Sequence, residues 1–129
     1  MAGYPGLLLR ILSAKNPAMG PGKARLVTLI ADTGSISAAA RRMGMSYRRA
    51  WQLVEALNRS FDQPVVLTAV GGKRGGGAVV TDFGKRLVKS YHAMEAKASA
   101  AIEADLEQFS AHLRKPSARR KTRQSRSMP

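Results

Sequence analysis

The stretch at residues 34–61, GSISAAARRMGMSYRRAWQLVEALNRSF, permits few folds. Either Ser35 or Ser37 is placed to cap a short helix, because a serine hydroxyl accepts a hydrogen bond from a free N–H of the first turn. Gly44 ends that helix, since glycine adopts positive φ without steric cost. Ser46 then caps a second helix. Two helices joined by a sharp turn that contains glycine predict a helix-turn-helix.

The second helix has two distinct faces. Apolar residues recur at helical spacing on the face that should meet a core, namely Ala50, Trp51, Val54, Leu57 and Phe61. The other face carries Tyr47, Arg48, Arg49, Gln52, Glu55 and Arg59. Arg48 and Arg49 stand in the first turn, where the positive end of the helix dipole disfavours cations. An isolated Arg-Arg pair is usually solvated surface, but the turn motif and the total charge favour a docked phosphate.

Composition restricts the class of partner. The chain has 129 residues, which suits one domain with a modest core, and its 22 Lys+Arg against 8 Asp+Glu give a formal charge of +14. This charge predicts a polyanionic partner, either nucleic acid or an anionic membrane surface. No apolar run approaches the roughly 20 residues that span a bilayer. The absence of cysteine excludes disulfides and fits a reducing cytoplasm.

Shorter elements flank this stretch. We expect a strand at 7–12, a loop at 13–22, and a helix at 23–32 with Pro21 near its start. Strands at 65–70 and 78–81 enclose the loop GGKRGGG, and such a hairpin after a helix-turn-helix is a wing. Lys73 and Arg74 at its tip are predicted to contact the DNA backbone or the minor groove. The loop leads into a strand and lacks GK[ST], so it is no nucleotide-binding phosphate loop.

A long helix is expected at 82–113, capped by Thr81. It carries one apolar stripe, which should pair with a second copy of the chain. Packing onto its own domain could cover only the first half of this stripe. The predicted dimerisation residues are Leu87, Tyr91, Met94, Ile102, Leu106 and Phe109.

Residues 114–129 are basic, with few apolar side chains, and are expected to be a disordered tail that adds salt-sensitive affinity for nucleic acid. The chain therefore divides into a winged helix-turn-helix domain at 1–81, a dimerisation helix at 82–113 and this tail. The predicted class is mainly α with a small β-sheet.

The sequence offers no catalytic constellation. His92 and His112 lie roughly six turns apart on the predicted long helix and cannot share a metal. No Ser-His-Asp set, carboxylate pair or metal-ligand spacing is apparent. We therefore expect neither an enzyme nor a bound cofactor or metal.

The run RLVTLIADTGSISAAARRMGMSYRRAWQLVEALN, followed by VGGKRGGGAVVTDFGKRL, resembles the N-terminal winged-helix domain of the ModE family of molybdate-dependent transcriptional regulators. The resemblance covers about residues 7–95. Its most specific parts are SYxxAW, the GGKxGGG wing and the TxxGxxL segment made by Thr81, Gly84 and Leu87. More distantly, GSISAAARRMGMS resembles the helix-turn-helix of LysR-type regulators.

The resemblance implies a dimer paired through the long helix and the first strand, with the helix from Ser46 in the major groove. It implies that Arg48, Arg49 and Gln52 read bases and that Lys73 and Arg74 serve the wing. ModE regulators carry C-terminal domains that bind molybdate, whereas this chain has a basic tail at the corresponding place. We therefore expect no molybdate binding by this chain.

Three hypotheses of function follow. The first is a homodimeric, sequence-specific regulator of transcription that binds double-stranded DNA, cytoplasmic and associated with the nucleoid. The second is an architectural nucleoid protein that binds DNA by charge and shape. The third is an interaction module whose long helix pairs with another regulator and whose basic tail binds RNA or anionic lipid. The first is preferred, and its predicted DNA-binding residues are Ser35, Ser37, Ser46, Tyr47, Arg48, Arg49, Gln52, Lys73 and Arg74.

Overall fold

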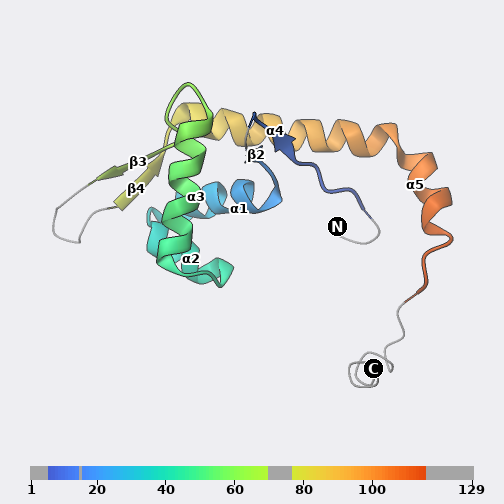
Figure 1. Cartoon of the computed structure of the whole chain (residues 1–129), viewed down its shortest axis with the longest axis horizontal. Coiled ribbons are helices and arrows are strands. Elements are labelled where there is room, and N and C mark those ends of the chain that lie inside the picture. The colour runs from blue at the N-terminus through green and yellow to red at the C-terminus, as the bar shows by residue number, and fades with distance from the viewer. Residues whose placement is uncertain (1–5, 15, 70–76, 116–129) are drawn as a thin grey trace, which may run out of the picture.

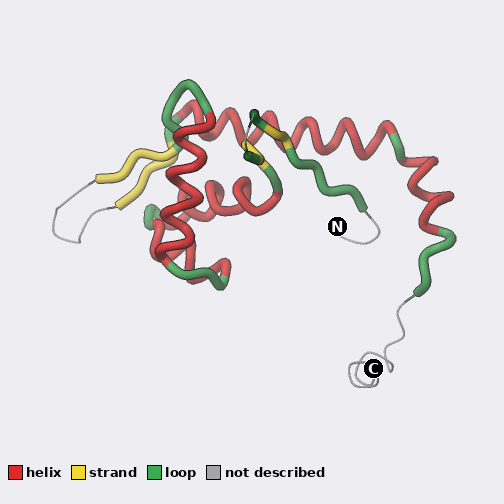
Figure 2. Tube along the Cα trace, viewed as in Figure 1, coloured by secondary structure: helices red, strands yellow, loops and turns green. Residues whose placement is uncertain are grey.

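The computed structural model describes residues 6–14, 16–69 and 77–115. It shows a small helical body with one long helix that extends beyond it (Figure 1). Figure 2 shows that helix predominates, as the sequence predicts, beside two short hairpins, of which only the second was predicted. In chain order the elements are β1 (Ile11–Leu12), β2 (Pro17–Met19), α1 (Pro21–Thr33), α2 (Ile36–Met43), α3 (Tyr47–Ser60), β3 (Val66–Ala69), β4 (Gly77–Val80), α4 (Asp82–Ala101) and α5 (Glu103–Ser110).

The core lies around α1, which contacts α2, α3, α4, β2 and β4. Apolar residues at helical spacing on α1 and α3 turn inward, because burying them removes apolar area from water. The largest fully buried side chains are Tyr91, Leu26, Ile30, Leu57, Val27, Val54, Val65 and Val66. One continuous core therefore joins the three helices, the second hairpin and the start of α4.

Two glycines end the first two helices. Gly34 and Gly44 both have φ of 71°, a left-handed conformation that side chains disfavour. Of the two serines proposed as caps for α2, Ser35 is the one whose hydroxyl accepts the Ala38 N–H, at 2.9 Å. The Gly34 carbonyl also accepts the Ala78 N–H at 3.0 Å. The turn before α2 is thus tied to β4.

The hairpin β3–β4 is antiparallel, with Val66 opposite Val80 and Ala69 opposite Gly77. Its strands lie within about one residue of the predicted bounds, apart from Val70, which falls outside the described residues. Lys73 and Arg74 also fall outside them.

The side chain of Asn58, near the end of α3, holds the start of this hairpin. Its Oδ1 accepts the N–H groups of Val65 at 2.8 Å and Val66 at 3.1 Å, and its Nδ2 donates to the Val66 carbonyl at 2.9 Å. Sequence reasoning missed this role, because an asparagine late in a helix has no local signature for it.

The N-terminal segment differs from expectation in two ways. Only Ile11 and Leu12 of the predicted strand at 7–12 are in a strand. The predicted loop at 13–22 contains β2, which pairs antiparallel with β1. Pro17 and Gly20 suggested a loop, but proline is compatible with the first residue of an edge strand.

The single helix predicted at 82–113 is wrong. α4 ends at Ala101, Ile102 has φ of −109° and ψ of 11°, and α5 ends at Ser110. Glu103 and Asp105 lie in the first turn of α5, where acidic side chains favour a new helix start. Within the described residues, no helix has the length and apolar character needed to span a membrane.

Only the first half of α4 belongs to the body. Gly84, Val88 and Tyr91 are buried there, whereas α5 has no buried residue. The Tyr91 hydroxyl donates to the Leu9 carbonyl at 2.6 Å. Tyr91 is 1% exposed, so its prediction as a dimerisation residue is corrected: it packs inside its own chain.

Candidate nucleic-acid interface

Helix α3 presents the two faces that its sequence predicts. Ala50, Val54 and Leu57 are fully buried, while Trp51 and Phe61 are half-buried. The Phe61 ring meets the Phe83 ring edge-on, with centroids 6.3 Å apart. All the predicted polar residues of this helix are exposed: Tyr47, Arg48, Arg49, Gln52, Glu55 and Arg59.

Backbone and side-chain hydrogen bonds fix the start of α3. The Ser46 hydroxyl accepts the Arg49 N–H at 3.0 Å, as a helix cap does. The N–H of Gly44 donates to the Arg41 carbonyl at 3.2 Å, and that of Met45 to the Ala40 carbonyl at 3.0 Å. The turn between α2 and α3 is therefore closed by local bonds, which holds the first turn of α3 in place.

Tyr47 and Trp51 form a pair one helical turn apart. The indole Nε1 of Trp51 donates to the Tyr47 hydroxyl at 2.6 Å, and Tyr47 remains 53% exposed. This bond restricts the tyrosine ring to one side of α3. The SYxxAW pattern thus acquires a physical meaning: Ser46 caps the helix, Tyr47 and Trp51 bond, and Ala50 allows close packing.

The other two predicted serines have structural bonds. Ser35 is half-buried and its hydroxyl caps α2, while the Ser37 hydroxyl accepts from the Arg41 guanidinium at 3.3 Å. Both lie in the first part of the α2 segment, away from the turn into α3. Ser35 and Ser37 therefore lie at the start of α2. The start of α3 brings together the other predicted residues of this region, Ser46, Tyr47, Arg48, Arg49 and Gln52.

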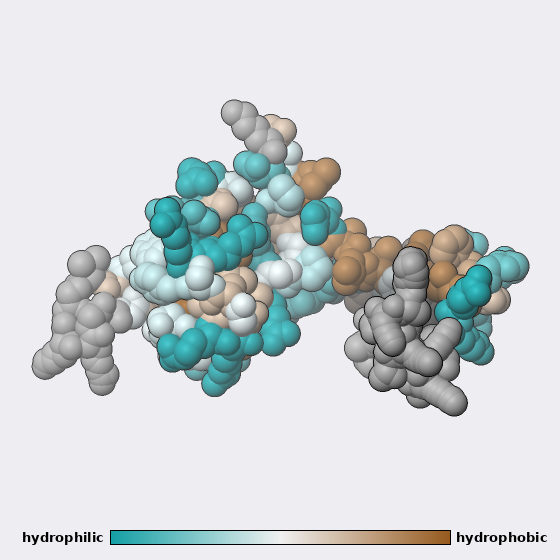
Figure 3. All heavy atoms as spheres, turned by 60° about the horizontal axis from the view of Figure 1, so that its bottom comes forward, coloured by the Kyte–Doolittle hydropathy of each residue, from teal (hydrophilic) through white to brown (hydrophobic). Residues whose placement is uncertain are grey.

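Sequence reasoning overlooked two arginines beside this surface. Arg41 and Arg42 lie in the last turn of α2, where the negative end of the helix dipole favours cations, and both are exposed. The high positive charge of the chain was the sequence signal that could have pointed to these two arginines. Figure 3 turns this end of the body toward the viewer, and hydrophilic residues prevail there.

Within the described residues, no carboxylate forms a salt bridge with the arginines of this surface. The contact between a basic and an acidic side chain that is recorded in the described part of the chain is the hydrogen bond between His92 Nδ1 and Glu95 Oε1 on α4, at 2.7 Å. Four of the eight acidic residues, Glu95, Glu103, Asp105 and Glu107, also lie on the α4–α5 segment. The described residues contain no group of three or more His, Cys, Asp or Glu side chains suited to a metal. The arrangement favours binding of an anion by guanidinium and amide groups.

Comparison with known proteins gives two kinds of match. The model of the bacterial regulatory helix-turn-helix protein, lysR family, matches residues 23–85. The molybdenum-pterin-binding protein MopB of Rhodobacter capsulatus is 48% identical over 86 residues, which are 67% of this chain and 32% of that protein. The DNA-binding transcriptional dual regulator ModE of Escherichia coli K12 is 42% identical over 71 residues, 55% of this chain and 27% of that protein.

Among solved structures, full-length LysG of Corynebacterium glutamicum with bound effector Arg has 25% identity and a TM-score of 0.49, covering 74% of this chain and 30% of that one. This chain spans about a third of the length of the curated relatives named MopB, MopA and ModE that it matches.

The capped α2–α3 pair and the β3–β4 hairpin define a winged helix-turn-helix domain. Within that class, the N-terminal region of this chain is a ModE-like helix-turn-helix domain, as its relatives named MopA, MopB and ModE indicate.

Proposed function

We propose that this chain is a homodimeric regulator of transcription that binds specific sequences of double-stranded DNA. The observation that carries the proposal is the exposed face of α3, where Arg48, Arg49 and Gln52 follow a turn held by Ser46. A helix of this kind enters the major groove with its N-terminal residues at the base edges. Relatives named as transcriptional regulators support the same reading. Such a protein would act on the nucleoid, in the cytoplasm.

Base recognition in this proposal falls to the first turns of α3. An arginine fork on guanine O6 and N7 contributes about 1–3 kcal/mol of discrimination. Replacing Arg48 with alanine should therefore relax the preference at one base position of each half-site. Arg59 is a matched control, because it is an exposed arginine in the last turn of the same helix. Lys73 and Arg74 of the wing are proposed to contact the backbone, and Lys73→Ala should weaken all sequences alike.

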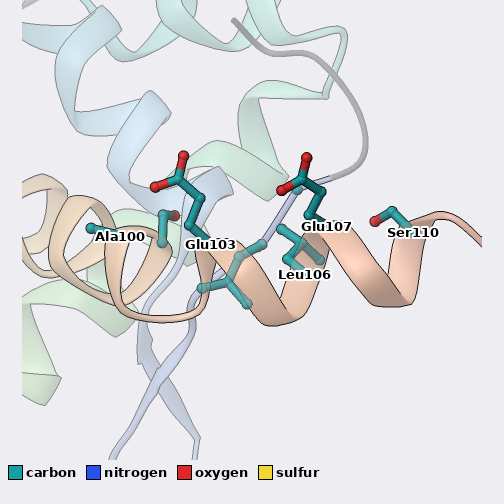
Figure 4. Close-up of a pocket in the computed structure, with 8 residues that line it drawn as sticks. Ala100, Glu103, Leu106, Glu107 and Ser110 are labelled. Atoms are coloured by element: carbon teal, nitrogen blue, oxygen red, sulfur yellow. The ribbon is translucent and has the colours of Figure 1, made fainter.

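The α4–α5 segment supports the proposed dimer. Met94, Phe109 and Leu113 are 41%, 67% and 49% exposed. Figure 3 shows apolar surface gathered between the body and α5. Beside it lies a cavity of about 590 Å³, lined by Gly6, Leu7, Ser99, Ala100, Glu103, Leu106, Glu107 and Ser110. Figure 4 shows the Glu103 and Glu107 side chains on the same side of α5.

A second copy of the chain would cover this apolar surface. We retain Leu87, Met94, Ile102, Leu106 and Phe109 as the proposed interface. Phe109→Asp should weaken dimerisation by roughly tenfold or more, since burying such a side chain contributes about 1.5–3 kcal/mol. Gln108→Asp, the exposed neighbour, is the control for charge. Sedimentation equilibrium measures both, and equal dimerisation of the two variants would contradict the proposed interface.

The first experiment is selection of random duplex DNA by the purified chain at near-physiological salt. Enrichment of a palindrome with half-sites about one helical turn apart supports the dimeric regulator. Strong, salt-sensitive binding without enrichment supports the architectural protein instead. Equal or tighter binding to RNA or to anionic liposomes supports the interaction module.

A further inference from the structure

A second cluster of cations lies beside α3 and shares Arg49 with the exposed face of that helix. A cavity of about 470 Å³ is lined by residues of α3, of the N-terminal hairpin region and of the start of α1. Three of its lining side chains are cationic, and each comes from a different part of the chain: Arg10 precedes β1, Lys23 belongs to the first turn of α1, and Arg49 belongs to α3. The described residues that line it include no acidic side chain.

Lys23 is the best-defined member of this cluster. Its side chain is half-buried, and its Nζ donates to the Pro17 carbonyl at 2.7 Å, which holds the ammonium at the cavity. Burial lowers the pKa of Lys23, and the charges of Arg10 and then Arg49 lower it further. Three like charges therefore face one another in a hollow, an arrangement that an anion would stabilise.

Backbone N–H groups in the first turn of α1 add to the positive electrostatic potential of this cavity. Gly20, the cap residue, has no side chain to bond the first turn, and that turn holds no acidic residue. The N–H groups of Gly22 and Lys23 begin a helix of 13 residues and add partial positive charge at the cavity. Asn16 lines the same cavity and offers an amide.

We propose that the cleft between Arg10, Lys23 and Arg49 binds a tetrahedral oxyanion of the phosphate type. The oxyanion has two possible sources, a backbone phosphate of bound DNA or a free anion in solution. The first rests on the proposed function, because it places a DNA strand beside α3. It would make Arg10 and Lys23 positioning contacts that carry no sequence information.

The first arm of the test uses the full chain without DNA. Sodium phosphate is titrated at constant ionic strength against chloride, and NMR follows the Gly22 and Lys23 amides and the Lys23 side chain. The expected result is a saturable shift together with a rise in the Lys23 pKa, since a bound anion favours the ammonium. Lys23→Gln and Arg10→Gln should weaken phosphate about tenfold or more. Arg25→Gln, an exposed cation of α1 outside the cleft, should change nothing.

The second arm measures affinity for a selected duplex against salt. If a DNA phosphate occupies the cleft, Lys23→Gln lowers the slope of log K on log salt by about 0.9 and Arg25→Gln does not. Saturable phosphate binding with an unchanged slope assigns the cleft to a free oxyanion. The proposal is overturned if phosphate gives no saturable shift and the slope is unchanged. If the wild type still enriches a palindrome in that case, the proposed function survives.

Conversely, the wild type could show no sequence preference and still bind phosphate saturably. That outcome would support the proposed oxyanion site and contradict the proposed function. Circular dichroism of Lys23→Gln and Arg10→Gln confirms that each variant is folded before either arm is interpreted.

Discussion

The body is stabilised by a buried core of its own, whereas the α4–α5 arm (residues 94–113) is not. In the body, α1 to α3 bury a shared core, and Ser35, Ser46 and Thr81 cap their helices. In the arm no residue is buried. The arm also carries four acidic residues, in contrast to the excess of cations in the chain as a whole. The body is therefore stabilised by contacts within the chain, whereas the arm exposes apolar surface that a partner could bury. Substitutions in the two regions should therefore respond differently to protein concentration.

The largest effect tests this contrast directly with two leucines. Leu57→Ala in the body should lower the free energy of unfolding by about 2–5 kcal/mol at any protein concentration, because it empties a fully buried site. Leu106→Ala in the arm should cost at most about 1 kcal/mol in dilute protein and more as dimers form. Urea denaturation at several protein concentrations measures both, and equal, concentration-independent losses would remove the contrast.

Gly84, at the start of α4, should show how tightly the body holds this helix. An added Cβ would lie 2.5 Å from the Val65 carbonyl oxygen and 2.9 Å from Val80 Cγ1. Gly84→Ala should therefore destabilise the chain by about 1–3 kcal/mol, despite the better helix propensity of alanine.

Gly22 is the matched control in the first turn of α1. An added Cβ there meets nothing within 4 Å, so Gly22→Ala should be neutral or stabilising by up to about 1 kcal/mol. Thermal unfolding compares the two variants, and a stabilised Gly84→Ala would show that α4 does not pack closely on the hairpin.

Gly44 tests the turn inside the body. Alanine at φ of 71° costs about 1–2 kcal/mol, whereas asparagine tolerates this conformation better. Gly44→Ala should therefore lower stability more than Gly44→Asn does. Chemical denaturation measures the difference, and an inverted order would contradict the left-handed turn.

Tyr91 joins the two regions and should give the smallest effect. Removing its hydroxyl in Tyr91→Phe deletes the bond to the Leu9 carbonyl and should cost about 1 kcal/mol near neutral pH. Burial, and then the nearby Glu95 carboxylate, raise the pKa of Tyr91 from 10.0 to about 12. Between these values the unfolded chain loses the proton first, so the contribution is complete below pH 10 and declines as the pH rises.

The difference in stability between wild type and Tyr91→Phe, measured from pH 8 to pH 12, isolates this titration from that of the lysines. A difference that stays constant across the range would mean that the hydroxyl titrates alike in both states.

Local chemistry explains what the sequence revealed in advance. Ser46, Gly44 and Thr81 act within three or four residues of themselves, and each occupies the capping position that its residue type predicts. The two faces of α3 followed from helical periodicity alone. The exposed site residues of α3 could be predicted for the same reason, although their contact with DNA stays a prediction.

Features set by distant parts of the chain could not be read in this way. β2 exists because Met19 pairs with Ile11, and Asn58 acts on a strand eight residues further on. Tyr91 fits the periodic apolar stripe as well as Met94 does, but only the fold shows that one is buried and the other exposed. The cleft near Lys23 combines three segments that are far apart in sequence.

The bond from Tyr91 to Leu9 spans 82 positions of the chain. It closes the core between a residue that precedes the helix-turn-helix and one that emerges from the ribosome only after the whole helix-turn-helix and wing. A nascent chain that has released residues 1–81 therefore carries every proposed base contact, yet lacks Val88 and Tyr91 to complete its interior. Because domains fold as units, this domain can complete its core only after α4 has left the ribosome.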